Sequence, residues 1–216
     1  MKMENRNFFC IYLDEKDTCV TATTADFDSK LSLHRELFYG NYENIQFPVT
    51  YKIVLGSRLH EIVSTDYSCI RLINSKVKTI FEENQFTGYK TFPVIFLDKN
   101  NREIHGYHGL SITGRAGFDN FSSSEIIDKI LITNQIIRKY KGQYVDEWDG
   151  SDFFCPKHTT STCVTPRVIE TLRENRIKNF RSVHSKDTVT PKIIVDKINR
   201  LREEYYKSKA AESIES

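Results

Sequence analysis

The sequence predicts an α+β fold in which two related β-α-β halves pack around mixed or antiparallel sheets. The first observation is a pattern that occurs twice, in residues 69–89 and, 91 residues later, in residues 160–180. Each copy has the residue types of a short strand, a capped helix, a turn and a second strand. The second observation is the content of 14 Phe and 11 Tyr in 216 residues, because aromatic side chains favour strands.

The two copies share residue types more than identities. Asn74 and Thr165 each precede the expected helix, where a side-chain oxygen can accept a hydrogen bond from an unpaired backbone amide. Gly88 and Asn179 are both expected in left-handed turns after the helix. Two unrelated strand–helix units with ordinary caps and turns would give a similar pattern. Three aligned pairs are identical, namely Val77 and Val168, Glu83 and Glu174, and Asn84 and Asn175.

The whole chain, residues 1–216, is predicted to form a single α+β domain. Its duplicated halves would span residues 45–115 and 145–187, with the boundary between them around 115–145. A C-terminal helix over residues 190–208 would follow the second half. This division follows from the two copies of the pattern, because the chain has no low-complexity stretch or linker that would mark a boundary.

Five segments precede the first copy. Residues 7–13 and 47–54 are rich in aromatic and β-branched side chains, so they predict strands, the first of them buried. The polar and acidic residues 15–28 predict an exposed hairpin or loop. Residues 31–38 predict a short helix, whereas residues 58–68 fit no single element.

A hairpin is predicted after the first copy. Residues 89–97 read as a strand that carries Pro93 at an edge or a bulge, because proline cannot donate to a neighbouring strand. Residues 98–102 have the composition of a turn, and residues 103–112 then return as the partner strand.

Further helices are predicted towards the C-terminus. Residues 122–130 predict a helix with Ser122, Ser123 or Ser124 as its cap, and residues 131–140 either extend this helix or form a strand. Thr190-Pro191 supplies a cap and a proline in the first turn of the C-terminal helix. One apolar face of that helix is expected to consist of Ile194, Ile198, Leu201 and Tyr205.

Composition excludes several classes of protein. The formal net charge of +2 argues against a nucleic-acid partner held by bulk charge. The sequence lacks a secretory signal and any run of about 20 apolar residues, so we expect a cytoplasmic protein that does not bind a membrane. No CxxC pair occurs, which predicts reduced and mostly buried thiols rather than a disulfide framework or a zinc site. The five cysteines are Cys10, Cys19, Cys69, Cys155 and Cys163.

Glycines and histidines between residues 105 and 117 raise two chemical possibilities. His105 and His108 lie three apart on an expected strand, so they would point to opposite faces and could not share a metal ion. Arg115 lies among glycines that could let backbone amides approach a phosphate, although their spacing matches no phosphate-binding motif and a turn is the alternative. The glycines are Gly106, Gly109, Gly114 and Gly117.

A second group of candidates follows the only tryptophan. Trp148 stands beside Asp149 and Asp152, which could form a binding patch or an acid–base pair. The alternative is a tryptophan that packs between the halves, followed by a turn into a strand. Cys155 lies three residues before His158, a spacing that could place a base beside a nucleophile, but no third group that would orient the base is evident.

Two segments resemble a bacterial immunity-protein family of polymorphic toxin systems, first catalogued as a domain of unknown function. Residues 66–78, DYSCIRLINSKVK, match its strand, polar cap and helix of the type S-x-K-V-K-x-[IL]. Residues 86–94, FTGYKTFPV, match its following G-[YVL]-x-[FP]-[FP]-P-V strand. Residues 148–154 are similar to the start of the family's second strand, and residues 164–175 to its second helix. The second G-x-x-F-x-P-V is degraded in residues 179–184.

The resemblance implies a non-catalytic intracellular binding protein that neutralises a cognate toxin. It implies no catalytic residues, no cofactor and no metal, and it identifies neither the contact surface nor the oligomeric state. Two other functions stay open on the residues alone. One is an enzyme that acts on a small phosphate or nucleotide ligand through the segment Gly106 to Gly117. The other is a regulatory partner-binding protein outside toxin systems.

Overall fold

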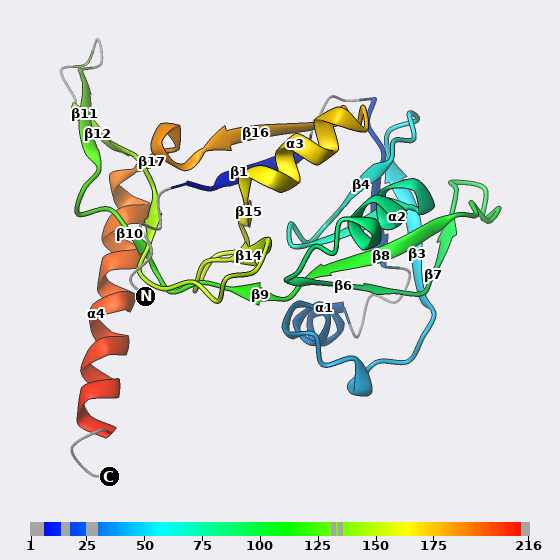
Figure 1. Ribbon diagram of the computed structural model, residues 1–216, viewed down its shortest axis with the longest axis horizontal. Helices are drawn as coiled ribbons and strands as arrows, with labels where there is room; N and C mark the ends of the chain where they lie inside the picture. The colour runs from blue at the N-terminus through cyan, green and yellow to red at the C-terminus, as the bar shows by residue number, and fades with distance from the viewer. Residues whose placement is uncertain (1–6, 14–17, 25–29, 131–132, 134–135, 213–216) are drawn as a thin grey trace.

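The protein combines helices with mixed and antiparallel sheets, so the predicted α+β class is confirmed. The computed structural model describes residues 7–13, 18–24, 30–130, 133 and 136–212. A seven-stranded sheet lies at one end of the molecule, and a hairpin with the long C-terminal helix lies at the other (Figure 1). None of the helices in these ranges is long and apolar enough to cross a membrane.

The first copy of the pattern forms a split β-α-β unit. β5 (Ile70–Asn74) leads into α2 (Ser75–Glu83), which returns the chain to β6 (Tyr89–Phe92). β8 (Tyr107–Ile112) lies between the two strands and runs antiparallel to both. β5 and β6 are therefore parallel, and the helix is their crossover connection.

The second copy forms the same kind of unit with a different central strand. β15 (Thr162–Val164), α3 (Pro166–Glu174) and β16 (Phe180–His184) correspond to the three elements of the first unit. Here β1 (Phe9–Leu13), from the start of the chain, lies between the parallel strands. The half predicted over residues 145–187 therefore lacks its central strand, which the N-terminal segment supplies.

The predicted hairpin of residues 89–97 and 103–112 is only partly correct. Pro93 divides the first strand into β6 and β7 (Val94–Leu97), which occupy the two opposite edges of the seven-stranded sheet. β6 pairs with β8, whereas β7 runs parallel to β3 (Val49–Leu55). Because β6 and β7 are consecutive in the chain, the sheet must bend until its two edges meet at Pro93.

The remaining strands of this sheet are β2 (Thr21–Thr24) and β4 (Ile62–Thr65). The prediction of an exposed hairpin or loop over residues 15–28 is wrong for β2, because Ala22 is fully buried; residues 14–17 and 25–29 lie outside the described ranges. α1 (Lys30–Tyr39) confirms the predicted short helix and is followed by the 3₁₀ turn η1 (Tyr42–Asn44).

One hydrophobic core joins the two units. Beside β15 lie β14 (Phe153–Cys155) and the short β9 (Gly114–Arg115), which complete a five-stranded sheet. Phe153 packs against Phe81 of α2, with ring centroids 4.8 Å apart, and it also contacts Tyr89 of β6. The side chains of β5, α2 and α3 therefore share one cluster, and neither unit has a separate main core.

The helix predicted over residues 122–130 is wrong. This segment forms β11 (Glu125–Ile130), which pairs with β12 (Ile136–Lys141), and β17 (Val189–Pro191) completes a three-stranded sheet. Ile126 and Ile130 lie four residues apart, which suits a helix face, but both also lie on one face of a strand. The partner strand decides between these two structures. Residues 131–132 and 134–135 lie outside the described ranges.

The C-terminal helix α4 (Lys192–Glu212) begins after Pro191, which lies in β17 rather than in the first turn. Ile198 is buried and Leu201 and Tyr205 pack beside it, as predicted, but Ile194 is exposed and Val195 is buried instead. Phe118 and Phe121 supply the other half of this small cluster. Nearby lie the paired strands β10 (Asp119–Asn120) and β13 (Tyr144–Val145), and the 3₁₀ turn η2 (Ser185–Asp187).

Candidate functional site

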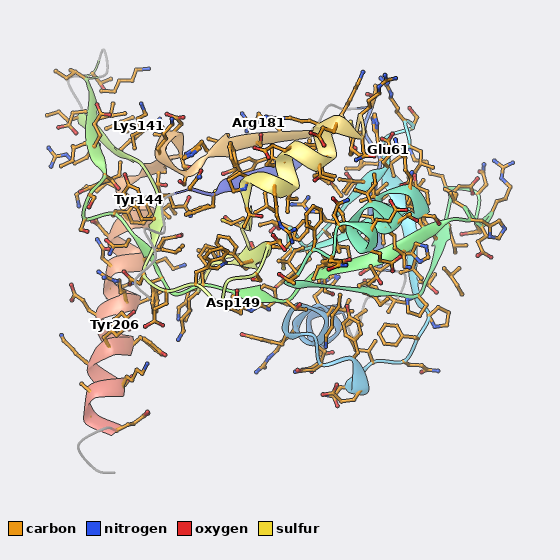
Figure 2. The ribbon with its side chains drawn as sticks, in the orientation of Figure 1. Glu61, Lys141, Tyr144, Asp149, Arg181 and Tyr206 are labelled. Atoms are coloured by element: carbon orange, nitrogen blue, oxygen red, sulfur yellow. The ribbon has the colours of Figure 1, made fainter. Side chains whose placement is uncertain are left out.

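A cavity of about 950 Å³ lies between α1, the loops beside β9 and β14, and α4. Aromatic side chains dominate its wall, and we call it the aromatic groove. Figure 2 shows Tyr206 on α4 and Asp149 on the loop below β9, which lie on opposite sides of this opening. Its aromatic residues are Phe38, Tyr39, Tyr67, Phe118, Trp148, Tyr205 and Tyr206.

Five residues singled out by the sequence line this groove, namely Arg115, Gly117, Trp148, Asp149 and His158. Arg115 is engaged in holding the fold together. Its Nη1 donates to the carbonyl oxygens of Ile112 and Gly114 at 2.8 and 2.9 Å, and its Nη2 donates to the carbonyl of Phe38. The guanidinium also lies 4.0 Å from the centre of the Phe38 ring. Arg115 therefore ties the end of α1 to β9.

The four glycines of the segment 106–117 do not come together at one site. Gly109 lies against the ring of Phe92, and Gly114 lies against the backbone of Phe153, so a side chain would fit at neither position. Gly117 is the member of the four that lines the groove. These glycines allow close packing between strands, and they do not form a common cradle for a phosphate.

Asp149 and Asp152 do not form an acid–base pair. Asp149 accepts hydrogen bonds from the amides of Arg115 and Ser151, at 2.6 and 2.9 Å, and so closes a loop at the edge of the groove. Trp148 donates from Nε1 to the carbonyl of Ser151 at 3.0 Å and packs on Phe154. Asp152 does not line the groove.

Asp152 joins the two units instead. Its carboxylate accepts hydrogen bonds from the amide of Thr87 at 2.9 Å, from Oγ1 of Thr165 at 3.0 Å and from Nε of Arg167 at 2.5 Å. Burial opposes ionisation of this group, but these hydrogen bonds outweigh burial and lower its pKa. The carboxylate is therefore an ionised structural group that links the turn after α2 to the start of α3.

Cys155 and His158 point to different environments. Cys155 is fully buried, and burial raises the pKa of its thiol to about 12, which disfavours the thiolate that a nucleophile requires. His158 is exposed and stacks on Phe118, with ring centroids 5.1 Å apart. All five cysteines are free and four are buried, which confirms the prediction of mostly buried thiols.

His105 and His108 also lie apart. His108 of β8 has its Nε2 3.2 Å from Oγ of Ser75, whereas His105 is exposed beside Glu103. Among the described residues, no group of three or more His, Cys, Asp or Glu side chains is arranged to hold a metal ion.

Sequence reasoning missed the α4 side of the groove. Tyr205 and Tyr206 reach it from the C-terminal helix, and Lys157 lies with its Nζ 3.1 Å from the centre of the Tyr205 ring. This cation–π contact places a positive charge on an aromatic surface. No local pattern indicates it, because the two residues are 48 positions apart.

The sequence analysis did not predict a second surface, because it assigned residues 122–130 to a helix. Seven of the twelve exposed large apolar side chains among the described residues lie on the sheet β11-β12-β17 and the first turn of α4. Ile130 and Ile136, 69% and 64% exposed, are directly paired, and Ile126 lies on the same face. We call these three side chains, Ile126, Ile130 and Ile136, the isoleucine surface. Ile137 and Val189 lie on the opposite face of the same sheet, because Ile137 follows Ile136 directly and Val189 pairs with Lys141.

Comparison of the chain with protein-family models gave no match, and comparison with curated proteins gave none either.

Proposed function

We propose that the protein is a non-catalytic binding protein that neutralises a cognate toxin in the cytoplasm of the cell that makes both. The isoleucine surface carries this proposal and would be the docking face. Exposed apolar side chains are common singly, but three of them side by side on one face of a small sheet are typical of a surface that another protein covers.

Two properties of this surface suit a protein partner. β11 is an edge strand, so its outer backbone groups can pair with a strand of another chain. The three strands and the first five residues of α4 carry five basic and three acidic side chains, formally +2, which favours a partner with an acidic rim. These charged residues are Lys129, Arg138, Lys139, Lys141, Lys192, Glu125, Asp128 and Asp196.

The engagement of the candidate chemical groups also supports binding over catalysis. Arg115 is bound to three backbone carbonyls, and Asp149 to two backbone amides. Asp152 is held by Thr87, Thr165 and Arg167. Groups occupied in this way hold the scaffold rigid, and a rigid scaffold lowers the entropic cost of covering a partner's active site.

The decisive experiment uses the product of the neighbouring gene as the candidate toxin. Purified protein should capture that product in a pull-down, and co-expression should rescue cells from its toxicity. If the candidate toxin is neither captured nor neutralised, that toxin is not the partner; if no neighbouring product is captured, the immunity function is contradicted.

Variants then locate the docking face. Ile130→Lys and Ile136→Lys should each weaken binding about thirtyfold, the effect of removing a contact worth about 2 kcal/mol. Leu55→Lys is the matched control, because Leu55 is 65% exposed but lies on the seven-stranded sheet. We expect its affinity to stay within about twofold of the wild type. Equal losses in all three variants would exclude the isoleucine surface as the docking face.

A further inference from the structure

A second cavity lies where the two sheets face each other, and we call it the inter-sheet pocket. Its volume is about 740 Å³. β1 and the start of β15 form one wall, and β2, β4 and β5 form the other. Thr160 is the residue that lines both this pocket and the aromatic groove. The volume lies in the range of pockets that hold small molecules.

Hydroxyl groups dominate the polar part of this pocket. Seven of its fifteen lining residues are serine or threonine. Some of these hydroxyls serve the fold, since Ser68 donates to the carbonyl of Thr160 and Thr65 to that of Ile70. Thr162 differs, because it is only 4% exposed and its Oγ1 has no hydrogen-bond partner among the described residues. A buried hydroxyl without a partner is costly, which points to a ligand atom as the missing partner.

Of the described residues that line the pocket, Arg71 is the positively charged one. It lies on β5 opposite Ser64 of β4 and is 9% exposed. Burial raises the pKa of Cys155 in the five-stranded sheet, while the charges of Arg115 and Arg71 act in the opposite direction. Arg71 lines the pocket together with residues of β1 and β15 on the opposite wall. Its planar set of N–H donors matches the two oxygens of a carboxylate or phosphate.

Among the described residues that line the pocket, Asp66 is the one that is acidic. Its carboxylate accepts a hydrogen bond from Oγ1 of Thr23 at 2.8 Å and lies 3.6 Å from Nε2 of His34. These contacts hold the Asp66 carboxylate in place at the edge of the pocket. Its removal should therefore favour an anion in the pocket, whereas the removal of Arg71 should oppose one.

We propose that the inter-sheet pocket binds the oxyanion group of a small molecule, a carboxylate or a phosphate, through Arg71 with hydrogen bonds from Thr162 and the neighbouring hydroxyls. This inference goes beyond the proposed function and does not depend on it. The pocket lies away from the isoleucine surface, so both can be occupied at once.

The test uses the purified full-length protein without any partner. Thermal unfolding is followed in sodium phosphate, in sodium succinate and in sodium chloride of equal ionic strength, and titration calorimetry then gives the dissociation constants. We expect phosphate or succinate to raise the midpoint of unfolding by several degrees above chloride, because a ligand that binds the folded state stabilises it. A shift with phosphate alone assigns a phosphate ligand, and a shift with succinate alone assigns a carboxylate.

Three variants test the site. Arg71→Met should abolish the shift, Thr162→Val should weaken binding severalfold with little change in shape, and Asp66→Asn should tighten it. Circular dichroism in chloride checks that each variant is folded. If Arg71→Met does not fold, the opposite effects of Thr162→Val and Asp66→Asn on anion affinity still test whether the pocket is the binding site. The proposal is overturned if no anion exceeds the chloride control, or if the folded variants bind as the wild type does.

Discussion

The two split β-α-β units have the same helix and turn but obtain their central strands from opposite directions along the chain. In the first unit β8 comes from downstream, and in the second β1 comes from the N-terminus. A helix and the turn after it depend on neighbours in sequence, whereas a strand that pairs on both sides depends on contacts between distant residues. Local structure is thus repeated here, and long-range structure is not.

The turns after the two helices agree in detail. Asn84 donates from Nδ2 to the carbonyl four residues earlier at 2.8 Å, and Asn175 does the same at 2.9 Å. The next residues, Gln85 and Arg176, both have left-handed backbones, with φ of 50° and 59°. The helix starts differ, because Asn74 caps its helix through its side chain and Thr165 forms no such bond. The hydroxyl of Thr165 donates to Asp152 instead.

The largest loss of stability is expected at the link between the two units. Asp152, whose side chain is 8% exposed, accepts hydrogen bonds from Thr87 of the first unit and from Thr165 and Arg167 of the second. We expect Asp152→Ala to lower the free energy of unfolding by about 3 kcal/mol, because it leaves these donors without their acceptor. Urea unfolding at neutral pH measures the change.

An exposed pair provides the control for this prediction. Asp128 receives two hydrogen bonds from Arg138, at 2.8 and 2.7 Å, but both side chains are more than a third exposed. Asp128→Ala should therefore cost less than about 1 kcal/mol. If the two substitutions cost the same, burial is not what makes the Asp152 link important.

The buried carboxyl of Asp119 should make the stability of the second unit depend on pH more strongly than that of the first. Burial raises the pKa of Asp119 to about 7, although a hydrogen bond from Nε2 of Gln143 at 2.7 Å opposes this shift. Oε1 of Gln143 accepts a weak hydrogen bond from Cys10 of β1, the central strand of the second unit. The folded pKa lies above the ordinary value, so this contribution to stability is complete below about pH 4 and is lost as the pH rises to about 7.

We therefore expect the free energy of unfolding to fall by on the order of 2 kcal/mol between pH 5 and pH 8, and Asp119→Asn to remove most of this fall. Amide hydrogen exchange should show β1 losing protection before β8 as the pH rises, after correction for the intrinsic exchange rates. A wild-type pH profile that Asp119→Asn leaves unchanged would assign the effect to other groups.

The same distinction explains how much of the structure could be predicted. The helices near Val77 and Val168 and their turns follow from local residue types, and they are present as expected. The prediction of a left-handed backbone at Asn179 is wrong, because the left-handed positions shared by both units are Gln85 and Arg176. Neither position is a glycine, the residue type that would indicate a left-handed backbone, so the turn type could not be predicted from the sequence.

Long-range pairing could not be predicted in the same way. The entry of β1 into the second unit and the separation of β6 from β7 at Pro93 depend on contacts between distant strands. The candidate site was found in part, since Arg115, Trp148 and Asp149 all line the aromatic groove. The isoleucine surface was missed because residues 122–130 were predicted to form a helix instead of the hairpin strand β11. The α4 side of the groove and the inter-sheet pocket were missed because each brings together segments that are far apart in the chain.

The identical asparagines test whether the two turns are equivalent in energy. Asn84→Ala and Asn175→Ala should each lower the free energy of unfolding by about 1 kcal/mol, because each removes one hydrogen bond to the last turn of its helix. Glu83 and Glu174, another identical pair, are exposed at the ends of the two helices, and their side chains form no hydrogen bond among the described residues. Their alanine variants should change stability by less than about 0.5 kcal/mol. A large difference between the two asparagines would show that only one turn depends on this contact.

The smallest expected effect has the opposite sign. Gln85→Gly and Arg176→Gly should each stabilise the protein by about 0.5 kcal/mol, because glycine adopts a left-handed backbone without the steric cost that a side chain adds, and this gain exceeds the entropy it loses on folding. Lys178→Gly is the control, since its φ is negative and glycine there should destabilise by a similar amount. Thermal and urea unfolding of all three variants measure the changes. If one of the two turns gains stability and the other loses it, the side chain at the losing position contributes contacts worth more than the strain, and the two units differ in the feature that they share most closely.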